Sequence, residues 1–364
     1  AGAASHAAGQ AVVLGLFVAL VLGTAGAALA PRLLAVMGAG PSVIATGSGY
    51  TRVMLGGSGS ILMLFLVNAI FRGAGDAAIA MRVLWLANAI NIVLDPCLIF
   101  GLGPFPHLGV AGAAVATTTG RSIGALYALS RLIRPGGRVT VRRRDLGVDA
   151  GVMGRLLRLS GAGALQTLIG SASWIGLVRI AATFGSSVLA GYTIGIRVVV
   201  FALLPSWGLS NAAATMVGQA LGAGRPERGA RAVQLTALYT CGVLTVVGAL
   251  FVALAHPIVG LFTADPDVLR TGTDCLRVIA LGFPFYAYGM VVTQAFNGAG
   301  DTWTPTWLNL VIFWVWEIPL AYALAIPMHF GPRGVFAAVA IAFSTFAVVA
   351  VILFRRGRWK RIKV

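Results

Sequence analysis

Two acidic residues, Asp95 and Glu317, lie deep inside long apolar stretches of the sequence. A charged side chain at the centre of a membrane helix costs roughly 2.5 to 3.5 kcal/mol on insertion scales, so such a residue needs a reason to be there. Most of the other acids fall in or near loops, where solvation or helix capping accounts for them: Asp76, Asp145, Asp149, Glu227, Asp265, Asp267 and Asp301. Asp95 and Glu317 are therefore the acids to which we assign chemistry.

Asp95 belongs to a short polar pattern. Asn88, Asn91 and Asp95 are spaced by three and four residues, so in a helix they share one face, which we expect to point to the protein interior. Burial disfavours the charged form of a carboxyl group, so access from one side or the other can switch its protonation. The same oxygens could instead ligate a dehydrated Na⁺. The pattern predicts a cation-coupling site for H⁺ or Na⁺, and a neutral acid that only joins helices is the structural alternative.

Glu317 has aromatic neighbours in the sequence, namely Phe313, Trp314 and Trp316. An acid beside aromatic rings can hold a lipophilic cation by charge and by cation–π attraction. We therefore predict substrate contacts for Glu317, Trp314 and Phe313, although these rings could equally serve packing. Gln166, on the polar face of the stretch from 153 to 184, is a further candidate for substrate contact, with interhelical hydrogen bonding as the alternative.

The composition requires a membrane protein. Of the 364 residues, 58% are hydrophobic and only 10% are charged, with a mean hydropathy of +0.90, whereas soluble domains carry about 25% charged residues. The net charge of +17 does not indicate nucleic-acid binding, because the arginines cluster between apolar runs and at the C-terminus. The three cysteines, Cys97, Cys241 and Cys275, lie in apolar runs without pairing motifs and are expected to be buried.

We count ten stretches long enough to span a membrane, so we predict an all-α polytopic protein with ten transmembrane helices. The stretches are approximately 11–34, 47–70, 79–102, 109–133, 153–184, 188–220, 230–259, 268–295, 305–326 and 334–354. If the basic loop 134–150 is cytoplasmic, alternation places the other basic clusters and the C-terminal tail on that side too. We therefore expect a bacterial inner-membrane protein with a cytoplasmic C-terminus, and with the lipid bilayer as its surroundings.

An internal repeat organises the chain. At a constant offset of 225, the phrase Phe71–Asp76 matches Phe296–Asp301, Gly47 matches Gly272, and Gly109 matches Gly334. An offset of six helices gives two parallel six-helix lobes. We expect an N-lobe at 1–133 that lacks its first two helices, a cytoplasmic linker at 134–152, a C-lobe at 153–356 and a basic tail at 357–364.

These phrases resemble the multidrug and toxic compound extrusion (MATE) transporters. The resemblance covers essentially the whole chain and rests on Pro205–Gln219 (PSWGLSNAAATMVGQ), Phe71–Asp76 (FRGAGD), Asn91–Asp95 (NIVLD) with Leu98–Gly101, and Glu317–Tyr322 (EIPLAY). It implies two six-helix lobes with alternating access and export of cationic amphiphiles against H⁺ or Na⁺. It also implies that Asp95 and Asn91 help form the cation site of the first lobe. Where some members carry a Glu on the first helix of the second lobe, Gln166 is the nearest residue here.

The predicted activity is thus secondary antiport of cationic or amphiphilic small molecules by a monomer, with H⁺ or Na⁺ as coupling ion and no other cofactor. A lipid-linked glycan flippase of similar architecture and a nonfunctional truncated fragment are the alternatives. An enzyme is not predicted, because the four histidines are scattered and no loop is long enough for a catalytic segment. ATP-driven export is excluded, because with lysines only at Lys360 and Lys363 there is no Walker A phosphate loop.

Overall fold

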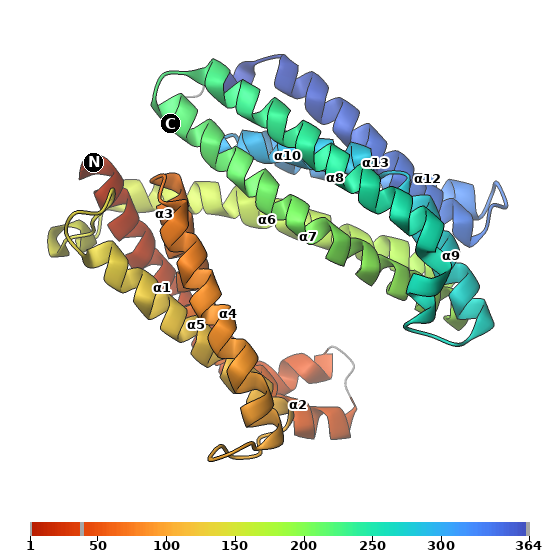
Figure 1. Cartoon of the computed structure of the whole chain (residues 1–364), viewed down its shortest axis with the longest axis horizontal. Coiled ribbons are helices and arrows are strands. Elements are labelled where there is room, and N and C mark those ends of the chain that lie inside the picture. Colours follow the sequence, from red (N-terminus) through yellow and green to blue (C-terminus); the bar gives the residue numbers. More distant parts are fainter. Residues whose placement is uncertain (1, 37–39, 362–364) are drawn as a thin grey trace. The chain divides into compact units, whose positions relative to one another are not determined.

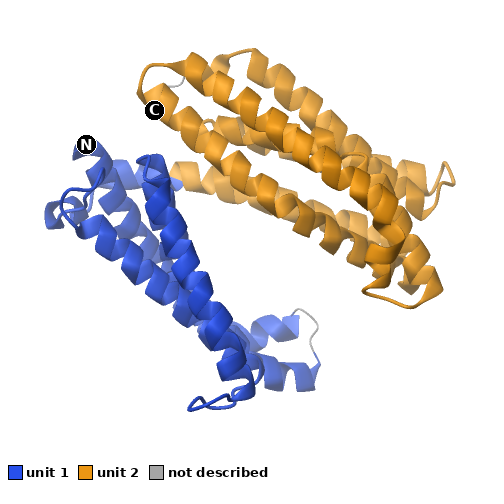
Figure 2. Ribbon diagram, viewed as in Figure 1, with its two compact units in different colours: residues 1–157 blue, residues 158–364 orange. Residues whose placement is uncertain are grey.

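The computed structural model describes residues 2–36 and 40–361, and the elements within these ranges are all helical. The chain forms two compact units, residues 1–157 (unit 1) and 158–364 (unit 2), coloured separately in Figure 2. Each unit is a bundle of long helices, as the apolar composition predicts, because a backbone in hydrocarbon must pair its polar groups within the chain.

Unit 1 contains five α-helices and one 3₁₀ turn. They are α1 (Gly2–Val36), α2 (Pro41–Gly56), α3 (Ser58–Gly73), α4 (Ala77–Phe100), α5 (Val110–Ile133) and η1 (Arg143–Leu146). Helix α5 packs against α2, α3 and α4, while α1 packs against α2 and α3 (Figure 1). The face of α4 turned away from α3 and α5 carries exposed apolar side chains such as Trp85, Ile92 and Val93.

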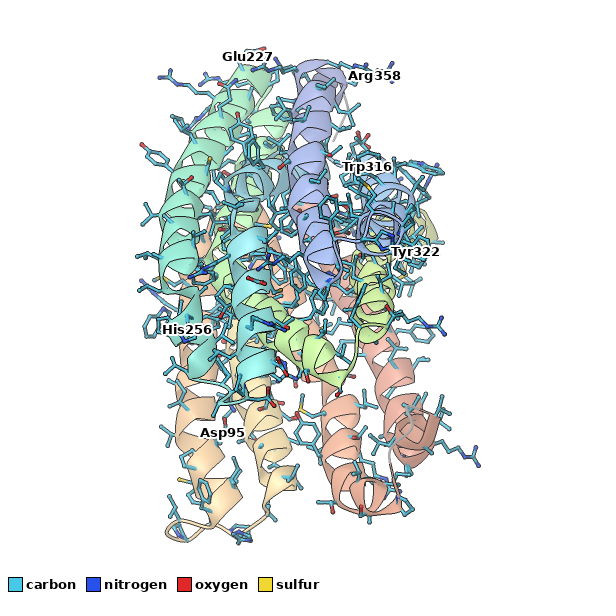
Figure 3. All side chains as sticks on the ribbon, turned by 90° about the vertical axis from the view of Figure 1, so that its right-hand side faces the viewer. Asp95, Glu227, His256, Trp316, Tyr322 and Arg358 are labelled. Atoms are coloured by element: carbon cyan, nitrogen blue, oxygen red, sulfur yellow. The ribbon has the colours of Figure 1, made fainter. Side chains whose placement is uncertain are left out.

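Unit 2 contains the longest helices. They are α6 (Ala150–Ala182, beginning in unit 1), α7 (Ser186–Gly222), α8 (Pro226–Gly260), α9 (Pro266–Ala280), α10 (Phe283–Gly298), α11 (Trp303–Asn309), the π-helix η2 (Leu310–Glu317), α12 (Ile318–Ala325), α13 (Pro332–Arg355) and the 3₁₀ turn η3 (Arg358–Arg361). Helices α7, α8, α9, α10 and α13 form its core. The start of α8 and the basic tail meet at one end of the unit, where Lys360 Nζ lies 2.8 Å from Glu227 Oε1 (Figure 3).

Among the described residues, eight helical segments are long and apolar enough to cross a membrane, or nine if the bent pair α9 and α10 counts as one span. Helix α5 is not among them, because its sequence mixes Thr117, Thr118, Thr119 and two arginines with small apolar residues. The all-helical membrane architecture is confirmed, while the number of ten spans stays a prediction.

The repeat is visible in the turns of both units. Asp76 and Asp301 each accept a hydrogen bond at the start of the next helix, from the backbone N–H groups of Ile79 and Thr304. The preceding glycines, Gly75 and Gly300, have φ values of +83° and +82°, a conformation that costs glycine least. The sequence offset of 225 therefore corresponds to the same turn built twice, an acidic cap on a helix that comes after a left-handed glycine.

Both units also break a span at the same repeat position. Unit 1 breaks between α2 and α3 at Gly57, and unit 2 breaks between α9 and α10 at Gly282, with a bend of 55°.

The offset of 225 does not hold as far as the last helix of each repeat. Gly109 caps α5 with a φ of +55°, and the residue that caps α13 in the same way is Gly331, not the predicted Gly334. The loop before the last helix is shorter in the second repeat, so the match of Gly109 to Gly334 was wrong.

Residues 134–149, most of the predicted linker, pack on unit 1. Gln10 of α1 is fully buried, and its side-chain amide donates to the carbonyl oxygens of Asp145 (3.0 Å) and Gly147, while its oxygen accepts from the N–H of Asp149 at 2.9 Å. Gly9 has no side chain because a Cβ there would collide with the Asp145 carbonyl. These contacts fix the segment that leads into α6. Its cytoplasmic position and the boundary at 152 stay predictions.

We expect Gln10→Met to destabilise unit 1 by about 2 to 4 kcal/mol, because three hydrogen bonds are lost and their backbone partners remain partly buried. Thermal unfolding of the purified protein in detergent, followed by a thiol-reactive dye, measures the change. Gln166→Met is the matched control, since Gln166 is partly exposed and makes no hydrogen bond within the described residues. Equal melting temperatures for both variants would contradict the role of Gln10.

Asp149 makes the contact between residues 145–149 and α1 sensitive to acid. Its carboxylate accepts hydrogen bonds from the Val152 N–H and from His6 (3.1 Å), which lower the pKa of Asp149. A lowered folded-state pKa contributes stability above the unfolded value of about 3.9, and this contribution is lost as pH falls below it. We therefore expect the wild type to lose thermal stability between about pH 4 and pH 3 more steeply than Asp149→Asn. Identical pH profiles for the two proteins would show that Asp149 does not contribute.

Candidate cation and substrate sites

Asp95 lies near the C-terminal end of α4 and is partly buried. Its Oδ1 atom is inaccessible to solvent and has no hydrogen-bond partner among the described residues. Pro96 follows it within the helix, and because proline has no N–H, the carbonyl of Ile92 one turn earlier lacks its helical donor. A proton or a cation would satisfy the unpaired carboxylate oxygen of Asp95.

Asn91 connects this region to the neighbouring helix. Its amide nitrogen donates to the Thr117 hydroxyl of α5 at 3.3 Å. The two helices approach closely because Gly120 lies against α4, where a Cβ would come within 2.7 Å of the Ala87 carbonyl oxygen. The sequence analysis did not identify Thr117. Its signal was the run of three threonines in a helix otherwise rich in alanine and glycine.

Asn88 lies elsewhere on α4. It is exposed in unit 1 and makes no hydrogen bond within the part of the chain that the structure describes. The structure thus turns Asn91 but not Asn88 toward α5, since two residues three positions apart differ by about 60° around a helix. A role for Asn88 in cation coupling stays a prediction.

Glu317 is one of the most deeply buried polar side chains of unit 2, with 3% of its surface exposed. It closes the π-helix η2 and has no ion pair or hydrogen bond to any described residue. In the same unit, the hydroxyl of Tyr192 on α7 is also buried without a partner in the described ranges. An acid and an unpaired hydroxyl therefore share the interior of one unit. Polar groups buried without a hydrogen-bond partner lower stability, which makes these two candidates for a functional role.

The aromatic neighbours of Glu317 separate onto different faces. Phe313 is partly buried and stacks on Phe346 with ring centroids 5.5 Å apart. Trp314 is 41% exposed, and its indole nitrogen donates to the Ile169 carbonyl of α6 at 2.9 Å. Trp316 is 43% exposed and lies at the surface of unit 2 (Figure 3). The structure therefore does not gather Trp314 and Trp316 around Glu317, since both indoles are exposed while Glu317 is buried.

The π-helix also changes how Glu317 relates to the first repeat. In unit 1, Gly112 packs on the backbone of Leu98, and in unit 2, Gly334 packs on the backbone of Leu324. The two leucines are 226 positions apart (324 − 98), one more than the offset of 225, as expected if η2 contains one inserted residue. Beyond the insertion, the position equivalent to Glu317 is Asn91. Both repeats therefore place a polar side chain at this level of the span, an amide in unit 1 and an acid in unit 2.

Gln166, the remaining substrate candidate, lies on α6 and is partly exposed, without a hydrogen bond within the described residues. Its helix is tied to the α11–η2 segment by Trp314 and by Thr306, whose hydroxyl donates to the Ala162 carbonyl at 3.2 Å. Within residues 2–36 and 40–361, no three His, Cys, Asp or Glu side chains gather closely enough to hold a metal ion. A Na⁺ site built from these residues alone would thus have fewer than three such side chains and would need amide, hydroxyl or carbonyl oxygens.

Comparison with known proteins decides the family. The model of the MatE family matches residues 2–97 and 164–323, two segments that contain Asp95 and Glu317 respectively. The chain belongs to the MatE family. It is 27% identical over 312 residues to the probable multidrug resistance protein NorM of Thermotoga maritima, covering 86% of this chain and 67% of that protein. The NorM protein of Caulobacter vibrioides is 30% identical over 313 residues, covering 83% and 63% of the two chains.

Solved structures agree with this assignment. The crystal structure of a MATE protein in the straight conformation superposes with a TM-score of 0.86 at 25% identity, covering 99% of this chain and 84% of that one. An outward-facing multidrug resistance MATE transporter of the MOP superfamily gives the same TM-score of 0.86. This MatE protein is therefore a multi-pass membrane transporter and not an enzyme, as the sequence analysis predicted.

We expect Glu317→Gln to leave the thermal stability of the protein unchanged or to raise it. The reason is that an amide of the same size avoids the cost of burying an ionisable carboxyl group. Melting in detergent at pH 7 and pH 9 measures this, with the exposed, ion-paired Glu227→Gln as control. A large loss of stability in Glu317→Gln alone would show that the carboxylate has a structural partner.

Proposed function

We propose that this protein is a secondary active antiporter that exports cationic or amphiphilic compounds in exchange for H⁺ or Na⁺ by alternating access. The single observation that carries the proposal is the unpaired, buried Oδ1 atom of Asp95, among the described residues, inside a membrane-spanning helix. Family membership adds support, because relatives include the multidrug export protein MepA of Staphylococcus aureus, 25% identical over 345 residues.

Asp95 and Asn91 are the proposed cation-coupling residues, with Thr117 as their partner on α5. Because the Asn91 amide nitrogen donates to Thr117, the amide oxygen is free to accept a hydrogen bond or to coordinate a cation. A gradient of either ion supplies enough free energy to drive export. One pH unit supplies about 1.4 kcal/mol per proton, and 100 mV of membrane potential supplies about 2.3 kcal/mol per charge.

Glu317, Phe313, Trp314 and Gln166 are the proposed substrate contacts in unit 2. Because Glu317 is 3% exposed, it would reach a substrate only after a rearrangement around the π-helix. Short π-helical segments often mark functional sites, which supports such a rearrangement at this position. Family membership by itself does not define the substrate class, since one relative is the FAD transporter of Shewanella oneidensis, 25% identical over 289 residues.

The membrane setting is part of the proposal. We place the protein in a bacterial inner membrane as a monomer, with the basic tail and the basic linker on the cytoplasmic side. The meeting of Glu227 and Lys360 at one end of unit 2 supports a common side for the tail and the turn before α8.

We expect Asp95→Asn to abolish ion-driven efflux of a fluorescent cation from everted membrane vesicles, while Asp267→Asn, a change of an exposed acid, leaves it intact. Imposed pH and Na⁺ gradients in separate experiments identify the coupling ion. Full activity of Asp95→Asn would remove it from the coupling role. Transport of a lipid-linked glycan without any cation efflux would favour the flippase alternative.

A further inference from the structure

At the C-terminal end of unit 2, a buried tryptophan fills the space between the helices. Trp359, just after α13, is completely buried, stacks on Phe354 with ring centroids 4.8 Å apart, and donates its indole hydrogen to the Phe354 carbonyl at 3.1 Å. It belongs to the same core cluster as Phe296 and Ala299 at the end of α10. The space between the α10–α11 turn and the end of α13 is thus filled by the protein's own indole.

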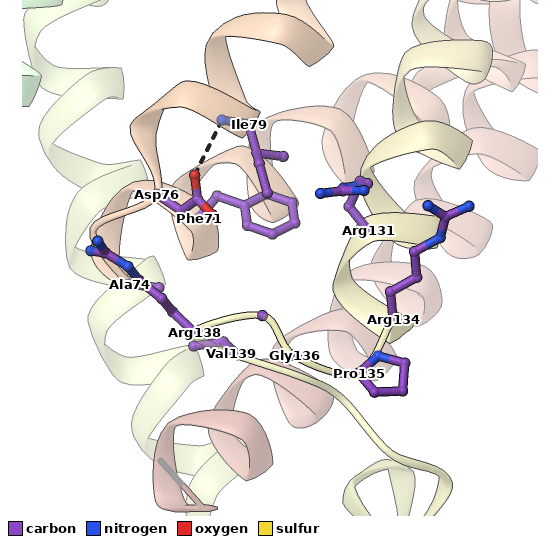
Figure 4. A pocket seen from close by; sticks show the side chains of 11 residues that line it. Phe71, Ala74, Asp76, Ile79, Arg131, Arg134, Pro135, Gly136, Arg138 and Val139 are labelled. Atoms are coloured by element: carbon purple, nitrogen blue, oxygen red, sulfur yellow. Dashed lines mark hydrogen bonds between the residues drawn. The ribbon is translucent and has the colours of Figure 1, made fainter.

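The equivalent place in unit 1 is open. Phe71 and Ala74, which correspond to Phe296 and Ala299 at the offset of 225, line a cavity of about 370 Å³ instead. The segment after α5 contributes Val139 rather than an indole, and this smaller side chain does not fill the space. The full lining is Phe71, Ala74, Asp76, Ile79, Arg131, Arg134, Pro135, Gly136, Gly137, Arg138 and Val139 (Figure 4).

Three arginines give the cavity its charge. Arg131 and Arg134 extend from the end of α5, and Arg138 lies beside Ala74, where it donates to the Gly75 carbonyl at 2.9 Å (Figure 4). None of the three forms an ion pair with a carboxylate in the described part of the chain. Asp76 is the one acid of the lining, and its Oδ1 is occupied by the Ile79 N–H at the start of α4. The lining therefore has an excess of positive charge, with unused guanidinium donors.

We propose that this cavity binds the phosphate group of an anionic glycerophospholipid. Guanidinium groups match phosphate oxygens in geometry and charge, and Phe71, Ile79 and Val139 offer an apolar floor for the glycerol backbone. The filled counterpart in unit 2 indicates that the bundle does not need this space to be empty. A bound ligand would explain why the equivalent space in unit 1 is unfilled and lined by arginines.

The position favours a lipid over a soluble phosphate compound. The cavity lies where α5 ends, directly beyond Leu126 and Ile133, which are 66% and 63% exposed as expected for side chains that face acyl chains. Anionic lipids attract basic residues at the cytoplasmic surface, by about 1 kcal/mol for each Lys or Arg. This is the side on which the sequence places the Arg134–Arg144 segment.

The test is binding of phosphatidylglycerol to the purified protein, by native mass spectrometry and by the rise in melting temperature on lipid addition. We expect Arg131→Gln/Arg134→Gln to weaken the affinity about thirtyfold, which corresponds to the loss of about two charge contacts. Ala74→Phe keeps all three arginines but fills the cavity as Trp359 does in unit 2, and we expect it to abolish binding. Arg355→Gln/Arg356→Gln, at the end of α13, is the matched control and should bind as the wild type does.

Melting of each variant without lipid establishes that it is folded. Undiminished binding of phosphatidylglycerol by the folded Ala74→Phe variant would overturn the proposal. So would equal stabilisation of the wild type by phosphatidylcholine, or displacement of phosphatidylglycerol by an equal concentration of inorganic phosphate. The last result would assign the cavity to a soluble phosphate compound.

Discussion

Burial of polar groups in an apolar bundle is the constraint on which the rest of this structure depends. In the hydrocarbon region no water replaces a missing hydrogen bond, so each unpaired polar atom lowers stability. The backbone meets this constraint by forming helices throughout the described ranges. Many side chains meet it too, with threonines and serines bonded to their own helices. Asp95 and Glu317 are the acidic exceptions, and they define the candidate sites. Neutral side chains with buried, unpaired polar atoms among the described residues are Asn68, Thr118, Tyr192, Thr273, Thr293 and Asn297.

The two sites show how one architecture holds different chemistry. In unit 1, the close approach of α4 and α5 at Gly120 lets Asn91 reach Thr117, and Asp95 lies one turn further along α4. In unit 2, a π-helix occupies the equivalent span, and Glu317 at its end is buried in the core. An amide in one repeat and an acid in the other occupy matching levels. The repeats therefore share a backbone plan but place different polar groups at this level of the span.

The ends of the bundles differ in the same manner. Capping turns at Asp76 and Asp301 are nearly identical, because an acid three residues before a backbone N–H and a left-handed glycine form the same local structure wherever they occur. The segment after the last helix of each repeat, in contrast, depends on contacts with distant parts of its unit. Trp359 fills one end with an indole, while Val139 leaves a basic cavity at the other.

The sequence by itself determined the membrane class, most of the spans, the repeat and the capped turns, because hydropathy, helical spacing and turn chemistry act over a few residues. Only the tertiary structure decided that Asn88 is exposed while Asn91 contacts α5, that Gln10 holds residues 145–149, and that Glu317 is separated from Trp314 and Trp316. The physical reason is that periodicity defines which residues share a face but not what packs against that face. A single π-helical insertion, set by packing between distant segments, is enough to redirect a side chain that the sequence places only approximately.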